Sequence, residues 1–150
     1  MLRLSGANVV FAQLFSVGTS ANVGEIPQIA LLNDGRVVLA ATDLTAGGPL
    51  SQFLTSQYNW EGVGILDPNS GGVTAIPIAN LSSFPGVINC LAVSPDEQMV
   101  YVGNYISTVA GDVWAVPITG GTATQIATLP SGASAMAIDN DGTVLVGTLN

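Results

Sequence analysis

Residues 91–103 read LAVSPDEQMVYVG, an apolar stretch followed by an Asp-centred turn and a second apolar stretch. The same arrangement recurs at residues 29–41, IALLNDGRVVLAA, and at residues 136–148, MAIDNDGTVLVGT. Spacings of 62 and 45 positions separate the turn aspartates, which are Asp34, Asp96 and Asp141. A period of about 45 residues is typical of a four-stranded propeller blade. The sequence therefore predicts an all-β repeat protein.

The first two repeats are each followed by a second hairpin pattern, at residues 63–78 and 113–126. Gly-rich turns in these hairpins supply the positive φ angles that tight connections require. We therefore expect β-propeller blades of four antiparallel strands, A to D in chain order. Residues 45–60 lack this pattern and account for most of the longer first spacing. They are predicted to form a loop insertion between strands B and C.

A single partial β-propeller domain of about three blades is expected over residues 1–150. Its predicted parts are the end of one blade (1–18), two blades (25–80 and 86–129) and the first half of another (133–150). Three blades do not close a ring, and open sheet edges invite pairing. Either the chain is an open piece of a longer propeller whose other blades are missing, or a homodimer closes a six-bladed ring. In the second case each split blade takes strands A and B from one copy and strands C and D from the other.

The composition argues against several classes of function. The net charge is −8, and Arg3 and Arg36 are the only cationic residues. Such a chain does not attract nucleic acid or anionic lipid. No stretch approaches the ~20 apolar residues of a membrane span, and polar residues interrupt residues 1–21 where a signal peptide needs an apolar core. The acidic, Lys-free composition is typical of extracellular or cell-envelope proteins.

The chain contains no His and a single cysteine, Cys90. The lack of His removes Ser-His-Asp and Cys-His catalytic groups and imidazole metal ligands. One cysteine forms neither a disulfide framework within the chain nor a thiolate metal site, so Cys90 is expected to be a small buried hydrophobe. The remaining carboxylates, amides and hydroxyls suit a hard cation such as Ca²⁺, bound where the innermost strands of a propeller converge.

Residues 87–102, VINCLAVSPDEQMVYV, resemble a segment of the gluconolactonase-like family, the six-bladed propellers related to senescence marker protein. Residues 134–146, SAMAIDNDGTVLV, are similar to the corresponding segment one blade later. The likeness covers these two segments well and the other blades loosely. Propellers of the NHL and YVTN types share the same strand-turn-strand pattern.

The resemblance implies one divalent cation on the propeller axis, held by Glu and Asn residues and by an Asp that also acts as general base. Asn89 occupies the position of the metal-binding Asn before Ser-Pro-Asp. Ser134 stands where the catalytic Asp is expected and Pro27 where another Asn is expected, and neither takes that role. Glu25 is near enough to Pro27 to act as a shifted metal ligand. Asn89 has a second interpretation, as a cap of its own loop through hydrogen bonds to the backbone.

Aromatic residues of the 45–60 insertion are the candidates for contact with a ligand or partner, because aromatic side chains dominate binding surfaces. They are Phe53, Tyr58 and Trp60. Trp114, by contrast, is expected to pack inside its blade. The turn aspartates are expected to stabilise their turns and not to form a carboxylate site.

We therefore expect a non-catalytic β-propeller segment that acts as a binding or scaffolding module. The alternative is a metal-dependent, gluconolactonase-like lactonase or related hydrolase with an incomplete site. A third hypothesis is that the chain is a purely structural repeat of an envelope or surface protein.

Overall fold

The computed structural model describes residues 28–42, 61–70, 73–80, 87–105 and 110–149. It also gives the backbone of four short strands, β1 (Leu2–Ser5), β2 (Asn8–Ala12), β3 (Gly18–Thr19) and β4 (Asn22–Val23). These strands form two antiparallel pairs, β1–β2 and β3–β4. In the part of the chain that is described, no helix has the length and apolar character needed to cross a membrane.

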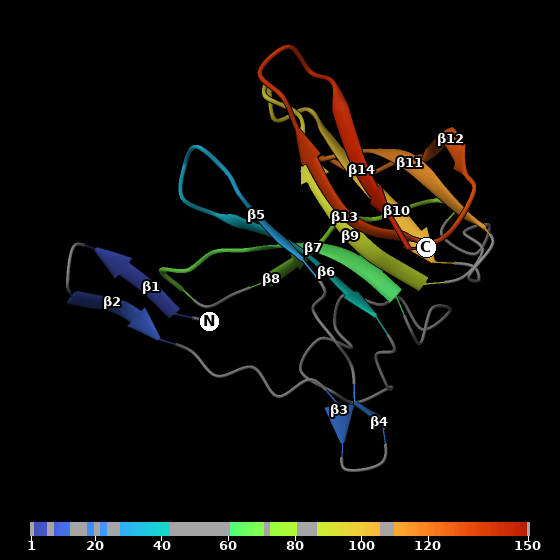
Figure 1. Ribbon diagram of the computed structural model, residues 1–150. Helices are drawn as coiled ribbons and strands as arrows, with labels where there is room; N and C mark the ends of the chain where they lie inside the picture. Colours follow the sequence, from blue (N-terminus) through green and yellow to red (C-terminus); the bar gives the residue numbers. More distant parts are fainter. Residues whose placement is uncertain are drawn as a thin grey trace.

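Two four-stranded antiparallel sheets make up most of the described chain (Figure 1). Sheet 1 has the order β5-β6-β7-β8, with the bounds Ile29–Leu31, Val37–Thr42, Glu61–Leu66 and Val73–Ala75. Sheet 2 has the order β9-β10-β11-β12, with the bounds Val87–Val93, Met99–Tyr105, Gly111–Pro117 and Thr124–Leu129. A pair follows, β13 (Ala133–Ile138) and β14 (Val144–Thr148). The predicted all-β fold with four-stranded antiparallel sheets is confirmed.

The first strands of the three repeats lie next to one another. β9 contacts β13 on one side, and β5 and β6 on the other (Figure 1). Consecutive repeats therefore stack face to face around these strands, in the manner of propeller blades.

The register of β9 with β10 decides which residues face each neighbour. Cys90 lies opposite Gly103 and Ala92 opposite Tyr101, so these four residues share one face of the hairpin. We call it the forward face, because it packs against β13–β14. The buried cluster at this contact consists of Cys90, Ala92, Val113, Ala133 and Met136.

The opposite face of the same hairpin packs against sheet 1. Leu91 lies opposite Val102 and Val93 opposite Val100, and we call this set the backward face. The buried cluster between the two sheets includes Val38, Ala40, Val63, Leu91, Val100, Val102, Trp114 and Val116. Burying one Val or Leu side chain contributes about 1.5–3 kcal/mol. Stacking on both faces is thus a main source of stability.

Cys90 and Trp114 take the structural roles expected of them. The Cys90 side chain is fully buried, and burial raises the pKa of its thiol to about 11. A Cβ at Gly103, across the ladder, would lie 2.6 Å from the Cys90 sulfur and 2.8 Å from the Ala133 Cβ. Trp114 is buried between the sheets. The close contact explains why a glycine faces this cysteine.

The A–B turn of sheet 2 departs from the Asp-Gly pattern of the other two repeats. Glu97 has a φ of 55°, while Gly35 and Gly142 each have a φ of 88° at the matching positions. The left-handed conformation is unfavourable for Glu. Its Oε1, however, accepts a hydrogen bond of 2.5 Å from the N–H of Asn33 in the turn of sheet 1. The unusual residue therefore joins two neighbouring turns.

The two sheets are also joined at the chain that follows β8. The Asn80 side chain donates to the carbonyl of Ala123 over 3.0 Å and accepts from its N–H over 2.8 Å. The N–H of Gly121 donates to the carbonyl of Pro77 over 2.8 Å. Gly120 has a φ of +92°, and a Cβ there would lie 2.5 Å from the Cγ of Pro77. Position 120 therefore needs glycine both for its left-handed backbone and for the space that Pro77 leaves.

We expect Gly120→Ala to lower the free energy of unfolding by more than Gly142→Ala does. Both glycines have left-handed φ angles, which cost an alanine about 1–2 kcal/mol. Gly142 has no heavy atom within 4 Å of its Cβ position, whereas a Cβ at Gly120 also meets Pro77. Denaturant unfolding of the two variants measures the difference. Equal losses would contradict the close approach of sheet 1 to this turn.

Candidate functional site

The first strands of sheet 2 and of the last pair each have one edge without a strand partner in the described part of the chain. β9 pairs only with β10, and β13 only with β14. Backbone groups along such an edge need other partners, because a buried unsatisfied donor or acceptor costs about 1–3 kcal/mol. In a propeller this edge faces the axis, where we expected a site.

Gln28 supplies partners for both of these edges. Its Oε1 accepts from the N–H of Leu91 over 3.2 Å, and its Nε2 donates to the carbonyl of Met136 over 2.9 Å. The side chain comes from the residue immediately before β5. It therefore joins the first strands of all three repeats. Sequence reasoning missed this role, since a single Gln before a strand carries no distinctive pattern.

Asn89 makes a second link between repeats. It lies half-buried in β9, and its Nδ2 donates to the carbonyl of Ala133, the first residue of β13, over 2.8 Å. This bond crosses to the next repeat. The interpretation of Asn89 as a cap of its own loop stays a prediction, because residues 81–86 lie outside the described residues. Its role as a metal ligand stays a prediction. With Nδ2 in this bond, Oδ1 is the atom that would coordinate a cation.

Most other residues predicted for the site lie outside the described residues. They are Glu25, Pro27, Phe53, Tyr58 and Trp60. Ser134, at the predicted position of a catalytic Asp, is exposed on β13. Among the described residues, no three His, Cys, Asp or Glu side chains gather closely enough to hold a metal ion. The metal site and the aromatic contact therefore remain predictions.

A buried polar group closes one end of β10 and β11, and the sequence analysis did not anticipate it. The Oδ1 of Asn104 accepts from the N–H of Asp112 over 2.5 Å. The Asp112 carboxylate accepts from Nε2 of Gln125 over 2.8 Å. Asn104 is 1% exposed and Asp112 is 6% exposed. The sequence feature that could have pointed to this group is the presence of Asn104 and Asp112 within two otherwise apolar strands. Both side chains bond within their own sheet, so the group fixes the strand ends.

Four aspartates, three exposed and one partly buried, hold turns of the described chain. Each accepts a hydrogen bond of 2.8–3.1 Å from the backbone N–H two residues later, and they are Asp34, Asp67, Asp96 and Asp141. Hydrogen bonds within each turn lower the pKa of all four carboxyl groups. The largest effects come from the N–H of Arg36 on Asp34, the N–H of Asn69 on Asp67, the Ser94 hydroxyl on Asp96 and the Thr143 side chain on Asp141. The expected stabilisation of turns is confirmed.

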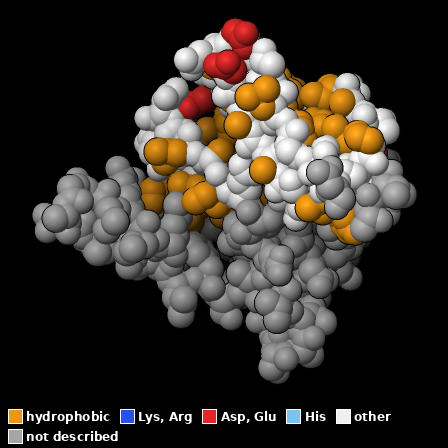
Figure 2. Space-filling model, in the orientation of Figure 1, with side chains coloured by type: hydrophobic (Ala, Val, Ile, Leu, Met, Phe, Trp, Pro, Cys, Tyr) orange, Lys and Arg blue, Asp and Glu red, His pale blue; other side chains and the backbone are white. Residues whose placement is uncertain are grey.

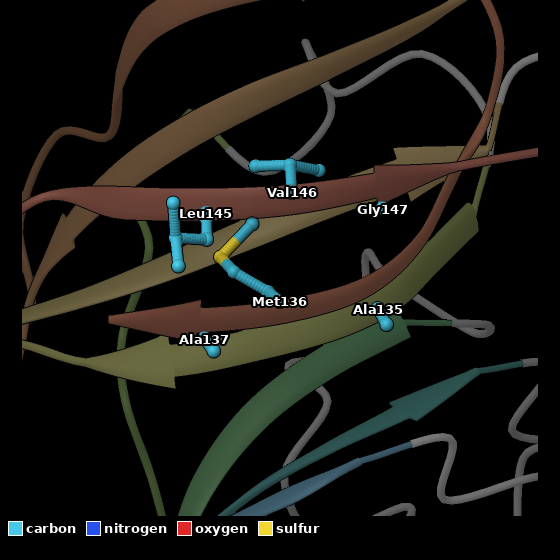
Figure 3. A pocket seen from close by; sticks show the side chains of 6 residues that line it. All are labelled: Ala135, Met136, Ala137, Leu145, Val146 and Gly147. Atoms are coloured by element: carbon cyan, nitrogen blue, oxygen red, sulfur yellow. The ribbon is translucent and has the colours of Figure 1, made fainter. Parts of the chain in front are cut away.

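A hollow of about 340 Å³ lies on the β13–β14 pair (Figure 3). It is lined by Ala135, Met136, Ala137, Leu145, Val146 and Gly147. None of these side chains is charged or carries a hydroxyl group. The hollow therefore offers apolar contact and no acid–base group.

No protein-family profile matches the sequence, and no curated protein matches it. The gluconolactonase-like assignment therefore stays a resemblance. Among solved structures, the chain is similar to the extracellular domain of BT4673 from B. thetaiotaomicron, a protein assigned to the one-component systems. The match has 19% identity and a TM-score of 0.51, and it covers 82% of this chain but 14% of that one. The likeness shows the fold, and this chain spans a small part of the larger one.

Replacing Asn89 with Ala should lower the free energy of unfolding by about 1–3 kcal/mol, because the Ala133 carbonyl loses its donor. Asn89→Asp should be at least as harmful at neutral pH, since a carboxylate has no proton to donate. Thermal unfolding with and without Ca²⁺ measures both effects. Asn140→Ala, in an exposed turn, is the control. A Ca²⁺-dependent rise in Tm for the Asp variant would instead identify a metal ligand.

Acid should destabilise the chain through its turn carboxyl groups. Their pKa is lower in the folded state, so their contribution is complete above about pH 4 and is lost as the pH falls through the lowered value. Urea unfolding over a series of pH values measures this loss. Asp96→Asn removes one of these groups, so its free energy of unfolding should fall less steeply with decreasing pH than that of the wild type. An equally steep fall in the free energy of unfolding would contradict the role of Asp96.

Proposed function

We propose that this chain is a non-catalytic β-propeller segment that acts as a binding or scaffolding module. The use of amide side chains beside the first strands supports this most directly. Gln28 and Asn89 bond to the backbone of neighbouring repeats, at Leu91, Met136 and Ala133. Such contacts hold sheets in register. A catalytic amide would instead face the substrate.

The carboxylates support the same proposal. A general base works best with a pKa near the operating pH, which requires an upward shift for Asp. The pKa of each of the four turn aspartates is lowered instead, because hydrogen bonds within the turns stabilise the charged carboxylate. Asp112 bonds within its own sheet. These groups suit the maintenance of the fold better than proton transfer.

We assign binding to the loops, because loops on a rigid scaffold carry most recognition residues. The insertion at residues 45–60 supplies Phe53, Tyr58 and Trp60, and aromatic side chains are enriched among residues that contribute most to binding. The likeness to the extracellular domain of BT4673 supports a place outside the cell, within a larger domain.

A metal-dependent lactonase of the gluconolactonase-like type is the second candidate. It is favoured by the position of Asn89 on the first strand of sheet 2, the place that the family resemblance gives to a metal-binding Asn. Ca²⁺ would be the cation, because the available ligands are oxygen atoms. This candidate requires ligands from residues outside the described part, Glu25 among them.

A binding screen tests the proposal with the purified chain and a panel of oligosaccharides and peptides. At least one compound should bind, and the double variant Tyr58→Ala, Trp60→Ala should weaken that binding by at least about 30-fold, since a single aromatic anchor contributes roughly 2 kcal/mol. Ile126→Ala, an exposed apolar residue of β12, is the control and should leave the affinity unchanged.

Two results would contradict the proposal. Affinities that stay the same in the double variant would remove the insertion from the binding surface. Hydrolysis of a sugar lactone that needs both Ca²⁺ and Asn89 would establish the lactonase instead. The Asn89→Ala variant is the control in that assay, provided that circular dichroism shows it to be folded.

A further inference from the structure

The four turn aspartates differ in the residue that follows each of them. This residue is Pro for Asp67, Glu for Asp96 and Gly for Asp34 and Asp141. An Asp side chain reacts with the backbone nitrogen of the next residue when that nitrogen carries a proton and no bulky side chain shields it. Pro has no N–H, and Gly has no Cβ. Asp34 and Asp141 are therefore the two turn aspartates suited to this reaction.

The turns around Asp34 and Asp141, which we call the first and last turns, have the same backbone. Gly35 and Gly142 each have a φ of 88°, and each donates over 2.9 Å to the carbonyl three residues earlier. In both turns the Asp Oδ1 accepts from the N–H two residues later over 2.9 Å. This bond closes a small loop of atoms that contains both the Asp Cγ and the Gly nitrogen. The backbone therefore holds the reacting atoms in the same way in both turns.

The residue after the glycine distinguishes the two turns. In the first turn, Nε of Arg36 donates to Oδ2 of Asp34 over 2.7 Å and forms an ion pair. The matching residue of the last turn is Thr143, which brings no charge. The Thr143 side chain lowers the pKa of Asp141, but a neutral hydroxyl stabilises a carboxylate less than a guanidinium does. The ion pair thus keeps Asp34 charged more firmly than Asp141.

The residue two positions before each aspartate adds to this difference. It is Leu32 in the first turn and Asp139 in the last. A second carboxylate nearby favours the protonated form of Asp141. The Glu97 carboxylate reaches the first turn, at the N–H of Asn33, but Arg36 offsets its charge there. Protonation is therefore easier in the last turn.

The last turn is also accessible. Residues 139–143 are all exposed, and no heavy atom lies within 4 Å of the Cβ position of Gly142. Figure 2 shows acidic side chains at the upper end of the described part, where Figure 1 places the turn between β13 and β14. Asp96 is exposed too, although its repeat packs on both faces, so exposure is a property of this end of the sheets. Neighbouring side chains therefore do not shield the nitrogen of Gly142.

We propose that Asp141 is a site of spontaneous conversion to isoaspartate. The nitrogen of Gly142 attacks Cγ of the protonated Asp141 side chain, and a C–N bond forms. The carboxyl hydroxyl leaves as water with the proton of the Gly142 N–H, which gives a succinimide ring. Water then adds to the original main-chain carbonyl of Asp141 and breaks its bond to nitrogen. Gly142 is now linked through Cγ, and the mass of the chain is unchanged.

This modification changes the connection between β13 and β14. The main chain gains one carbon atom, so the carboxylate no longer matches the N–H of Thr143 that it accepts from. Met136 of β13 and Val146 of β14 pack in the cluster against sheet 2. A distorted turn therefore weakens the contact between two repeats. The site does not depend on the proposed binding function.

Prolonged incubation of the purified chain at slightly acidic pH tests the proposal. Peptide mass spectrometry with electron-transfer fragmentation then measures isoaspartate at each turn aspartate. Asp141 should react about threefold faster than Asp34, the size of effect expected from one exposed ion pair. Asp96, which precedes Glu97, is the control within the same chain and should react more slowly than both.

Two variants exchange the residues that distinguish the turns. Arg36→Thr should raise the rate at Asp34 about threefold, and Thr143→Arg should lower the rate at Asp141 by a similar factor. Both positions are exposed, and circular dichroism checks the fold.

Two results would overturn the proposal. Isoaspartate at Asp141 that does not exceed the amounts at Asp34 and Asp96 would remove the site. Rates that stay unchanged in the folded variants would show that Arg36 does not protect Asp34. If one variant fails to fold, the comparison within the wild type still decides.

Discussion

A hairpin that is apolar on both faces has to be covered on both faces, and the rest of this structure depends on that constraint. In β9–β10 the alternation of side chains places Cys90 and Ala92 on one side and Leu91 and Val93 on the other. A single repeat on its own therefore leaves an apolar face exposed to solvent. Stability comes from stacking, so each repeat is defined by its two neighbours as much as by its own strands.

Stacking fixes where polar side chains are needed. Once the faces are packed, the first strands approach one another, and Gln28 and Asn89 pair backbone groups that lack strand partners. Farther from these strands, Asn80 performs the same task between sheets 1 and 2. The turns are joined by Glu97, in a conformation that the matching turns assign to Gly. These amides and this carboxylate bond across the boundaries between neighbouring repeats.

The sequence predicted the sheets well because their signals are local. Alternation and Asp-centred turns occur within about a dozen residues, and they located the strand pairs around Asp34, Asp96 and Asp141. The contacts between repeats were missed because they join distant residues, as Gln28 does with Met136. The sequence singled out Asn89 as a candidate metal ligand, but it did not indicate the hydrogen bond to Ala133, which lies 44 positions away. The aromatic insertion and Glu25 stay predictions, since they lie outside the described residues.

The polar atoms beside the first strands are largely used within the fold. The amide nitrogens of Gln28 and Asn89 donate to protein carbonyls, which leaves oxygen atoms for a ligand. In the case of Gln28 even the oxygen accepts from Leu91. The amide side chains beside the first strands are therefore occupied in holding the repeats together.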